Sequence, residues 1–311
     1  MPELPLATLR SRFGARLQEN VPLAHYTTAR VGGPADALLP VNSAEELART
    51  IEQVWELGVP YLILGGGSNV LVSDRGVREL VILNRTRNIR IDSKHQPPTA
   101  WAESGANLGA LARQTALRGF SGLEWASTIP GTTGGAVYGN AGAHGGDMAG
   151  SLLLAEILHP QLGRNWWPVE QMGYQYRSST LKSDPGRAVI LSAKLKLTPS
   201  TPEAVQAKIE NLSAERRSTQ PPGASMGSMF KNPSGDHAGR LIDSAGLKGR
   251  SLGGAEISSI HANFFVNRGA ASAEDILGLI HLAQESVAEK TGILLELEIE
   301  LIGEWNSTRG H

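Results

Sequence analysis

The segment GTTGGAVYGNAGAHGGDMAG occupies residues 131–150, and eight of its twenty positions are glycine. Fixing a glycine backbone costs more conformational entropy than fixing any other residue, so such a density is not filler. Ile129, Val137 and Tyr138, together with the absence of serine, argue against a flexible linker. We therefore expect the cluster from Ile129 to Gly146 to form a loop that lies flat against a planar ligand.

A second glycine cluster, Gly65-Gly66-Gly67, follows an apolar run at residues 59–64 that predicts a short buried strand. A glycine turn after a strand exposes backbone N–H groups that can bind an anion, so the turn is a candidate phosphate cradle. The alternative is an ordinary tight turn. The segment lacks the G-x-G-x-x-G spacing of a Rossmann fold and the Gly-Lys-Ser/Thr of a P-loop. Any nucleotide site here therefore belongs to neither of those folds.

The composition bounds the class of protein. The 311 residues are enough for two or three domains of roughly 100–200 residues each. A formal net charge of -1 offers no basic excess to neutralise a nucleic-acid backbone. The lack of cysteine and of metal-binding histidine spacing predicts no metal site. Without a leader segment or a membrane-length apolar run, we expect a soluble cytoplasmic protein that binds neither membrane nor nucleic acid.

Local signals predict a mixed, α+β fold class. Helices are expected to begin after Ser43, Asn107, Thr201 and Ser272, each a residue type that caps helix N-termini. Apolar runs and alternation predict strands at residues 59–64, 80–83, 152–158, 189–197 and 293–302. The proline- and glycine-containing stretch at residues 219–223 predicts a domain boundary.

Three polar residues are candidates for chemistry, although each has an ordinary alternative. Arg177 follows two tyrosines and precedes two serines, a setting that could hold a guanidinium rigidly for carboxylate binding; otherwise it is a surface arginine. Ser228 follows a glycine but lies outside the G-x-S-x-G motif of hydrolases, and most such serines are turn residues. Glu298 lies on the polar face of the expected final strand, where the default is a solvated carboxylate.

Taken together, the motifs resemble those of the UDP-N-acetylenolpyruvoylglucosamine reductase (MurB) family, in its shorter type without the extra tyrosine-bearing loop. The resemblance covers nearly the whole chain, and the order and spacing of the motifs make it specific. The matching segments are residues 27–35, 64–69, 122–124, 129–136, 140–143, 176–179, 227–233, 238–242 and 261–267.

The resemblance implies the FAD-binding fold of the vanillyl-alcohol oxidase (PCMH-type) superfamily in two subdomains, followed by a C-terminal α+β substrate-binding domain. The implied boundaries are residues 1–86 for the first subdomain and 87–212 for the second. Residues 292–311 would complete the second subdomain, and residues 213–291 would form the substrate-binding domain.

The implied activity is that of an oxidoreductase and flavoprotein. It would use NADPH and noncovalent FAD to reduce UDP-N-acetylglucosamine enolpyruvate to UDP-N-acetylmuramate. This step belongs to cytoplasmic peptidoglycan synthesis, and so to cell wall biogenesis, cell shape, cell division and the cell cycle. A monomer is expected. The alternatives are a related FAD-dependent oxidase of a hydroxy acid or sugar, and a nucleotide-binding module without catalysis.

The resemblance also assigns roles to individual residues. Arg177 and Glu298 would stabilise the negative charge that develops on the substrate, and Ser228 would protonate its C2 atom. Arg217 and Asn232 would hold the substrate. The residues implied to bind FAD are Gly65, Gly66, Gly67, Ser68, Asn69, Ile129, Gly131, Thr132, Gly134, Gly135, Asn140, Ala141 and Gly142.

Overall fold

The computed structural model describes residues 4–184 and 188–305, which form two compact units. The first unit is drawn from Met1–Leu38, Gly67–Val81 and Arg217–His311, and the second from Leu39–Gly66 and Ile82–Arg216. The division between units therefore falls inside the triple glycine, between Gly66 and Gly67. It also falls within three elements, which are β2 (Pro34–Val41), β5 (Val77–Asn84) and α7 (Pro202–Thr219).

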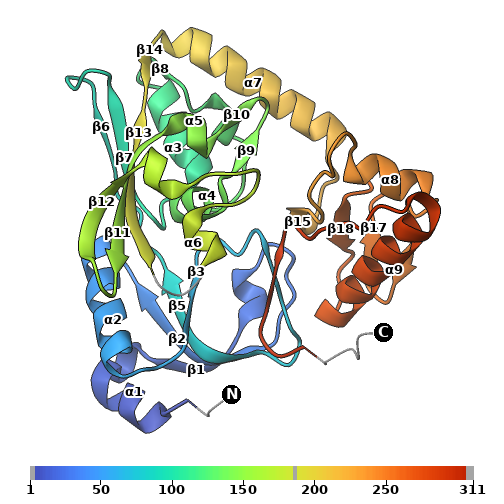
Figure 1. Ribbon diagram of the computed structural model, residues 1–311, viewed down its shortest axis with the longest axis horizontal. Helices are drawn as coiled ribbons and strands as arrows, with labels where there is room; N and C mark the ends of the chain where they lie inside the picture. The colour runs from blue at the N-terminus through green and yellow to red at the C-terminus, as the bar shows by residue number, and fades with distance from the viewer. Residues whose placement is uncertain (1–3, 185–187, 306–311) are drawn as a thin grey trace. The chain divides into compact units, whose positions relative to one another are not determined.

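The second unit contains a five-stranded antiparallel sheet of order β12-β11-β13-β7-β6 (Figure 1). Its strands are β6 (Ile89–Asp92), β7 (Thr99–Glu103), β11 (Leu152–His159), β12 (Gly163–Pro168) and β13 (Val189–Lys196). Alternate residues of the sheet, including Ala102, Ala155 and Ala193, pack into a core with helices α3 (Leu108–Ala116) and α4 (Thr133–Gly139). The strands expected at residues 152–158 and 189–197 are confirmed.

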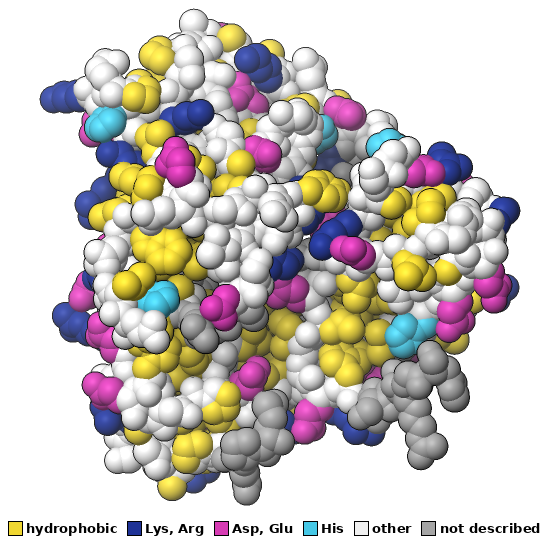
Figure 2. Space-filling model, in the orientation of Figure 1, with side chains coloured by type: hydrophobic (Ala, Val, Ile, Leu, Met, Phe, Trp, Pro, Cys, Tyr) yellow, Lys and Arg dark blue, Asp and Glu magenta, His cyan; other side chains and the backbone are white. Residues whose placement is uncertain are grey.

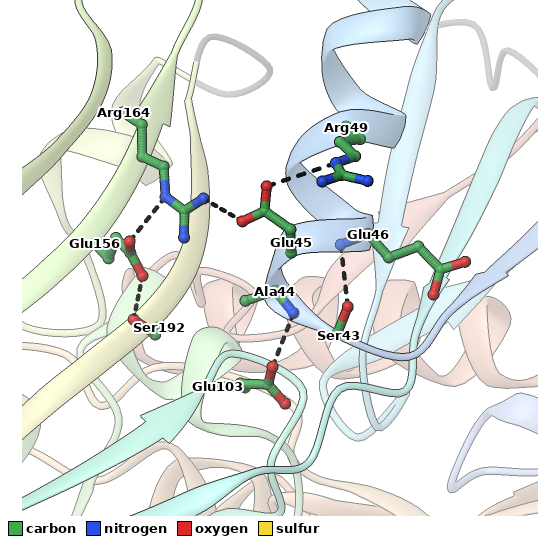
Figure 3. A network of polar contacts seen from close by, with 9 residues as sticks. All are labelled: Ser43, Ala44, Glu45, Glu46, Arg49, Glu103, Glu156, Arg164 and Ser192. Atoms are coloured by element: carbon green, nitrogen blue, oxygen red, sulfur yellow. Dashed lines mark hydrogen bonds and ion pairs between the residues drawn. The ribbon is translucent and has the colours of Figure 1, made fainter.

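The opposite face of this sheet meets the N-terminus of α2 (Ala44–Glu56) through polar contacts (Figure 3). The buried Glu103 carboxylate accepts a hydrogen bond from the Ala44 N–H at 2.8 Å. Arg164 joins Glu45 of the helix at 2.7 Å to Glu156 of the sheet at 2.8 Å. A buried carboxylate is costly unless it is hydrogen-bonded, and this network provides the bonds that fix α2 to the sheet.

The first unit has a four-stranded antiparallel sheet of order β15-β18-β17-β16, covered by helices α8 and α9 (Figure 1). Its elements are β15 (Ala224–Ser228), α8 (Ala238–Ser244), β16 (Ser251–Leu252), β17 (Ala255–Ile257), β18 (Phe264–Asn267) and α9 (Ala273–Thr291). Apolar residues of α9 at helical spacing, Ile276, Leu279 and Ile280, are buried in one cluster with Phe230 and Phe265.

Side-chain caps set the helix boundaries where the sequence predicts them. Ser43 and Asn107 accept hydrogen bonds from the backbone three residues onward, and Ser272 with Asp275 forms a complete capping box. Gly292 ends α9 in the left-handed conformation with φ 72°. The helix expected after Thr201 is α7, whose first residue is Pro202. All four helices are therefore confirmed.

The remaining strands are short or belong to small sheets. A four-stranded sheet has the order β1-β2-β5-β3, in which β1 and β2 pair antiparallel with Gln18 opposite Leu38. The other elements are α1 (Leu6–Phe13), β1 (Gln18–Pro22), β3 (Tyr61–Leu64), β4 (Val70–Val72), β8 (Phe120–Ser121), α6 (Thr180–Ser183), β14 (Thr198–Pro199) and β19 (Glu300–Ile302). No helix among the described residues is long and apolar enough to cross a membrane.

The C-terminal strand differs from the sequence-based expectation in length. Only Glu300–Ile302 of residues 293–302 forms a strand, and it pairs parallel with Val70–Val72. The partner of β19 thus lies within residues 1–86, and the expectation that residues 292–311 complete the 87–212 subdomain stays a prediction. An alternating apolar pattern predicts a strand but does not specify its partner, because pairing depends on which edge tertiary packing leaves available. The wider division into three domains stays a prediction.

Candidate cofactor and substrate site

The two glycine-rich segments singled out from the sequence meet inside the second unit. A Cβ on Gly65 would lie 2.7 Å from Thr132 Oγ1, and one on Gly66 would lie 3.1 Å from the Cα of Gly131. These distances leave no room for a side chain, so glycine is required for the two backbones to approach. The structure thus joins two candidate FAD-binding segments that lie some sixty residues apart in the sequence.

Residues 131–150 are only partly a loop, so the expectation of a continuous flat loop is wrong. They contain α4, a short hairpin of β9 (Gly142–Ala143) and β10 (Gly146–Asp147), and α5 (Met148–Ser151). The Thr132 hydroxyl caps α4 by accepting from the Gly135 N–H at 3.3 Å. A Cβ on Gly134 would lie 2.7 Å from the Cβ of Ser104, so glycine permits helix packing here. Capping and close packing override the low helix propensity of glycine.

The loop that precedes Ile129 holds a polar atom that the sequence reasoning missed. Thr128 Oγ1 is buried and has no hydrogen-bond partner among the described residues. Such an atom is costly to bury, so its presence beside Ile129 is an observation that a bound polar group would explain. This unpaired hydroxyl fits a ligand that has a polar edge. Thr128 borders a matching motif, which is the only sequence signal that could have found it.

Arg177 occupies a tight turn in the second unit. The backbone groups of Gln175 and Ser178 bond to each other in both directions at 3.1 Å, which places Arg177 at φ 54°. A positive φ is uncommon for a residue with a side chain and marks functional sites more often than other positions. The half-buried guanidinium donates to the Gly142 carbonyl at 2.9 Å. The structure therefore places Arg177, a catalytic candidate, against the hairpin that carries Gly142, a cofactor-binding candidate.

Three side chains anchor this turn to the end of α4. The Asn140 side chain donates to the Gln175 carbonyl at 2.9 Å and accepts from the Ala149 N–H at 3.0 Å. Tyr174 donates its hydroxyl to the Val137 carbonyl at 2.8 Å, and Ser179 donates to the Tyr138 carbonyl at 2.6 Å. Burial also raises the pKa of the Tyr174 phenol, which keeps it a hydrogen-bond donor. The Asn140 side chain therefore positions the turn that carries Arg177. A contact of Asn140 with a cofactor is a separate, proposed role.

In the first unit, Asn69 lies directly beside the segment of Glu298. The Asn69 side chain donates to the Glu298 carbonyl at 3.1 Å, and the Glu300 N–H donates to the Asn69 carbonyl at 3.0 Å. Gly67 precedes this contact with φ 58°, and a Cβ there would lie 2.0 Å from the Tyr26 carbonyl oxygen. One side-chain and one main-chain hydrogen bond of Asn69, a candidate cofactor residue, therefore hold it against the segment of Glu298, a candidate catalytic residue.

Ser228 is set at the end of β15 by a bulge. The register between β15 and β18 shifts between Ser225 and Ser228, and Gly227 within the shift has φ 80°. A bulge redirects the side chains that follow it, so this shift sets the direction of the half-buried Ser228. One residue later, the Glu298 N–H donates to the Met229 carbonyl at 2.9 Å. The chain segments of Ser228 and Glu298 therefore lie side by side.

The two candidate substrate residues lie on the surface of the first unit. Arg217 is exposed on α7. Asn232 is exposed, and its Oδ1 accepts from the Ala238 N–H at 3.1 Å, at the first residue of α8. Asn232 thus holds the start of α8. Among the described residues, no group of three or more His, Asp or Glu side chains could hold a metal ion.

Comparison with known proteins defines the class first. The FAD binding domain model matches residues 35–155, which include Gly65–Asn69 and Gly131–Gly142 with the helix α4 inside the latter. The chain is therefore an FAD-dependent oxidoreductase of the fold class predicted from the sequence. A second model, the C-terminal domain of UDP-N-acetylenolpyruvoylglucosamine reductase, matches residues 219–302.

Full-length relatives then identify the family. A protein named UDP-N-acetylenolpyruvoylglucosamine reductase from Chloroflexus aggregans is 42% identical over 92% of this chain and 97% of its own. One of the same name from Rubrobacter xylanophilus is 45% identical over 91% of this chain and 94% of its own. The crystal structure of MurB from Thermus caldophilus matches with a TM-score of 0.79 and 39% identity, over 92% of this chain and 99% of that one. The chain belongs to the UDP-N-acetylenolpyruvoylglucosamine reductase family.

These findings confirm the predicted family, fold class and FAD cofactor, with NADPH as reductant, and they favour the reductase over the oxidase alternative. The roles of the individual site residues are proposals.

Proposed function

We propose that this chain reduces the enolpyruvyl ether of UDP-N-acetylglucosamine to the lactyl ether of UDP-N-acetylmuramate, with NADPH as the hydride donor. Membership of the reductase family over nearly the whole chain supports the reaction. The structural observation that carries the assignment is the pairing of the Ser228 and Glu298 segments through the Met229 carbonyl. The backbone segments that carry a hydroxyl and a carboxylate, from residues seventy apart, are there hydrogen-bonded to one another, which supports roles in proton delivery and charge stabilisation at one site.

The FAD would be held by the glycine-rich segments. The turn Gly65, Gly66, Gly67, Ser68 and Asn69 offers backbone amides to the pyrophosphate, and residues Ile129 to Gly142 would line the isoalloxazine. When bound, FAD supplies the means to pass a hydride from NADPH to C3 of the enolpyruvyl group. We propose that the FAD is bound noncovalently. The chain has no cysteine that could attach it.

Arg177, Ser228 and Glu298 would stabilise charge on the substrate and donate a proton to it. Hydride addition to C3 places negative charge on the carbon and carboxylate beside it. Arg177 would stabilise this charge with its guanidinium, which is already oriented by the hydrogen bond to Gly142. Ser228 would donate its hydroxyl proton to C2, which completes the lactyl ether. Glu298 would stabilise the same developing charge by hydrogen bonding or by polarising a neighbour.

The remaining assignments extend this proposal. Arg217 and Asn232 would bind the sugar nucleotide, and residues 213–291 would serve as its binding domain. We propose that the enzyme works as a monomer in the cytoplasm, where the product would enter peptidoglycan synthesis and so support wall biogenesis, cell shape, cell division and the cell cycle. On the face shown in Figure 2, Lys/Arg and Asp/Glu side chains are interspersed, which suits small-molecule ligands rather than a nucleic acid.

The test is an anaerobic visible absorbance titration of the purified holoenzyme. We expect a flavin spectrum that NADPH bleaches and that UDP-N-acetylglucosamine enolpyruvate restores, because the two half-reactions are separate. UDP-N-acetylglucosamine without the enolpyruvyl group serves as the control and should restore nothing. A flavin that returns only when oxygen is admitted would refute the proposed reaction while leaving the cofactor assignment intact.

A further inference from the structure

Asn263 bonds to both main-chain groups of Phe230, two residues after the proposed proton donor. The Phe230 N–H donates to Asn263 Oδ1 at 2.9 Å, and Asn263 Nδ2 donates to the Phe230 carbonyl at 2.8 Å. The side-chain amide thus makes the pair of bonds that a neighbouring strand residue would make. Only one orientation of the amide satisfies both bonds, so the donor and acceptor positions follow from the contacts themselves.

These two bonds between the Asn263 amide and the Phe230 main chain, called the Asn263 clamp below, are needed because the backbone at Met229 is irregular. In a regular strand the N–H and C=O of one residue point to the same side. At Met229 the N–H donates to the Asn263 carbonyl at 2.8 Å, whereas the carbonyl accepts from the Glu298 N–H on the other side at 2.9 Å. The last β15–β18 pair is Ser228 opposite Phe264, the first residue of β18, so the main chain of β18 ends before the position opposite Phe230, and the Asn263 side chain takes that place.

The clamp is also buried, which makes its loss consequential. Met229 and Phe230 are 0% exposed and Asn263 is 3% exposed. Water therefore cannot replace the bonds to Phe230 if the amide is removed. On its other side the same segment is hydrogen-bonded to the chain before β19, because the Lys231 N–H donates to the Glu296 carbonyl at 2.9 Å. The backbone that follows Ser228 and the segment of Glu298 are thus held in one hydrogen-bonded frame, and the Asn263 amide completes it.

We infer that Asn263 is the positioning residue that fixes Ser228 relative to Glu298 for protonation of the substrate. This inference rests on the proposed function, in which Ser228 delivers the proton. Asn263 acts through Met229 and Phe230 rather than by touching the substrate. Its removal should slow the step that needs Ser228 and leave the step that precedes it nearly unchanged.

The experiment compares Asn263→Leu with the control Asn267→Leu in the full-length holoenzyme. Asn267 stands at the far end of β18, where its amide donates to the Ala29 carbonyl at 2.9 Å and accepts from the Gly269 N–H at 2.7 Å. Its side-chain amide also bonds to main-chain groups, but these bonds involve neither Met229 nor Phe230. Asn263→Asp is the second variant, because it keeps the shape and the acceptor but, when ionised, cannot donate to the Phe230 carbonyl.

Stopped-flow absorbance measures each half-reaction, and hydrogen exchange of the Phe230 and Glu298 amides measures the frame without substrate. We expect Asn263→Leu to slow flavin reoxidation at saturating sugar nucleotide by on the order of a hundredfold, the effect of a misplacement near 1 Å. NADPH-dependent bleaching should change less than about threefold, and both amides should exchange faster. Asn263→Asp should shift all readouts in the same direction, and Asn267→Leu should shift none of them.

Two different failures are distinguishable. An Asn263→Leu enzyme that reoxidises at the parental rate, or that loses both half-reactions equally along with Asn267→Leu, would overturn the positioning role. If Asn263→Leu does not fold, the same criteria apply to Asn263→Asp. A parent enzyme that the sugar nucleotide cannot reoxidise would instead refute the proposed function, and the exchange rates of Phe230 and Glu298 would still report whether Asn263 holds the frame.

Discussion

Individual side chains at the site are placed by backbone features more than by contacts of their own. Arg177 sits at φ 54° in a turn, and Ser228 follows a bulge whose Gly227 has φ 80°. Strained or irregular backbone of this kind persists only where the surroundings hold it. For Arg177 those surroundings include Asn140, whose side chain donates to the Gln175 carbonyl of the turn, and Ser179, whose hydroxyl donates to the Tyr138 carbonyl of α4. The side chains proposed to be reactive are therefore carried by backbone that the protein's own contacts hold in place.

The residue-scale prediction concerns Ser228→Ala. Only the second half-reaction needs a proton at C2, so NADPH-dependent bleaching should be nearly unchanged, while reoxidation by the sugar nucleotide should slow by at least about 100-fold. Stopped-flow absorbance under anaerobic conditions measures both rates. Ser225→Ala, on the same strand β15, is the matched control and should leave both rates intact. Equal losses in the two half-reactions of Ser228→Ala would remove Ser228 from the proposed role.

At the scale of elements, α4 shows how a glycine-rich segment can form a helix. Its N-cap hydroxyl, the left-handed Asn140 at its C-terminus and the contact of Gly134 with Ser104 compensate for poor helix propensity. The helix then presents its two ends to the site, with Thr132 against Gly65 at one end and Asn140 against the Arg177 turn at the other. Its position in the second unit therefore controls both the proposed FAD contacts and Arg177.

The element-scale prediction compares two alanine substitutions within α4. A Cβ at Gly134 would meet Ser104 at 2.7 Å, whereas one at Gly139 meets nothing within 4 Å. Overpacking typically costs about 1–3 kcal/mol, so Gly134→Ala should lower the free energy of unfolding by that amount and reduce the bound FAD. Gly139→Ala should be neutral or stabilising by up to about 1 kcal/mol, because alanine favours the helix.

Chemical denaturation gives the unfolding free energies of these two variants, and the ratio of flavin to protein absorbance gives their FAD content. Loss of FAD in Gly139→Ala but not in Gly134→Ala would contradict the packing argument for α4.

At the scale of the whole molecule, several carboxylates are more acidic in the folded state than usual. The pKa of Asp275 is lowered because the Ser272 and Gly254 backbone N–H groups donate to its carboxylate. The Arg268 hydrogen bond lowers the pKa of Glu256, and the Arg240 hydrogen bond lowers that of Asp236 to about 2. A lowered folded-state pKa means that the charged form is favoured by folding.

The corresponding prediction concerns stability against pH. The stabilisation from Asp275 is fully present above the unfolded-state pKa of roughly 3.9 and is lost as pH falls through the lower folded-state value. Thermal unfolding should therefore show a constant Tm from about pH 5 to 7 and a fall below about pH 4. Asp275→Asn should lower Tm at neutral pH, and its deficit should shrink in acid. Glu289→Gln, an exposed change on the same helix, should behave like the parent throughout.

Much of this protein is determined by short-range sequence information. The caps at Ser43, Asn107 and Ser272 act over three or four residues, so the sequence alone predicts where those helices begin. The order of the motifs likewise identifies the family, and with it the FAD cofactor, because glycines and polar residues at fixed spacing reflect backbone that must approach a ligand.

Tertiary structure decided the features that join distant segments. No local pattern states that β19 pairs with Val70–Val72, that Gly65 meets Thr132, or that the Asn263 amide completes the strand beside Phe230. Nor does one state that residues 131–150 hold a helix, since that helix depends on packing against Ser104. Hydrogen bonds between residues far apart in sequence depend on which backbone groups the rest of the fold leaves without partners, and only the assembled core determines that.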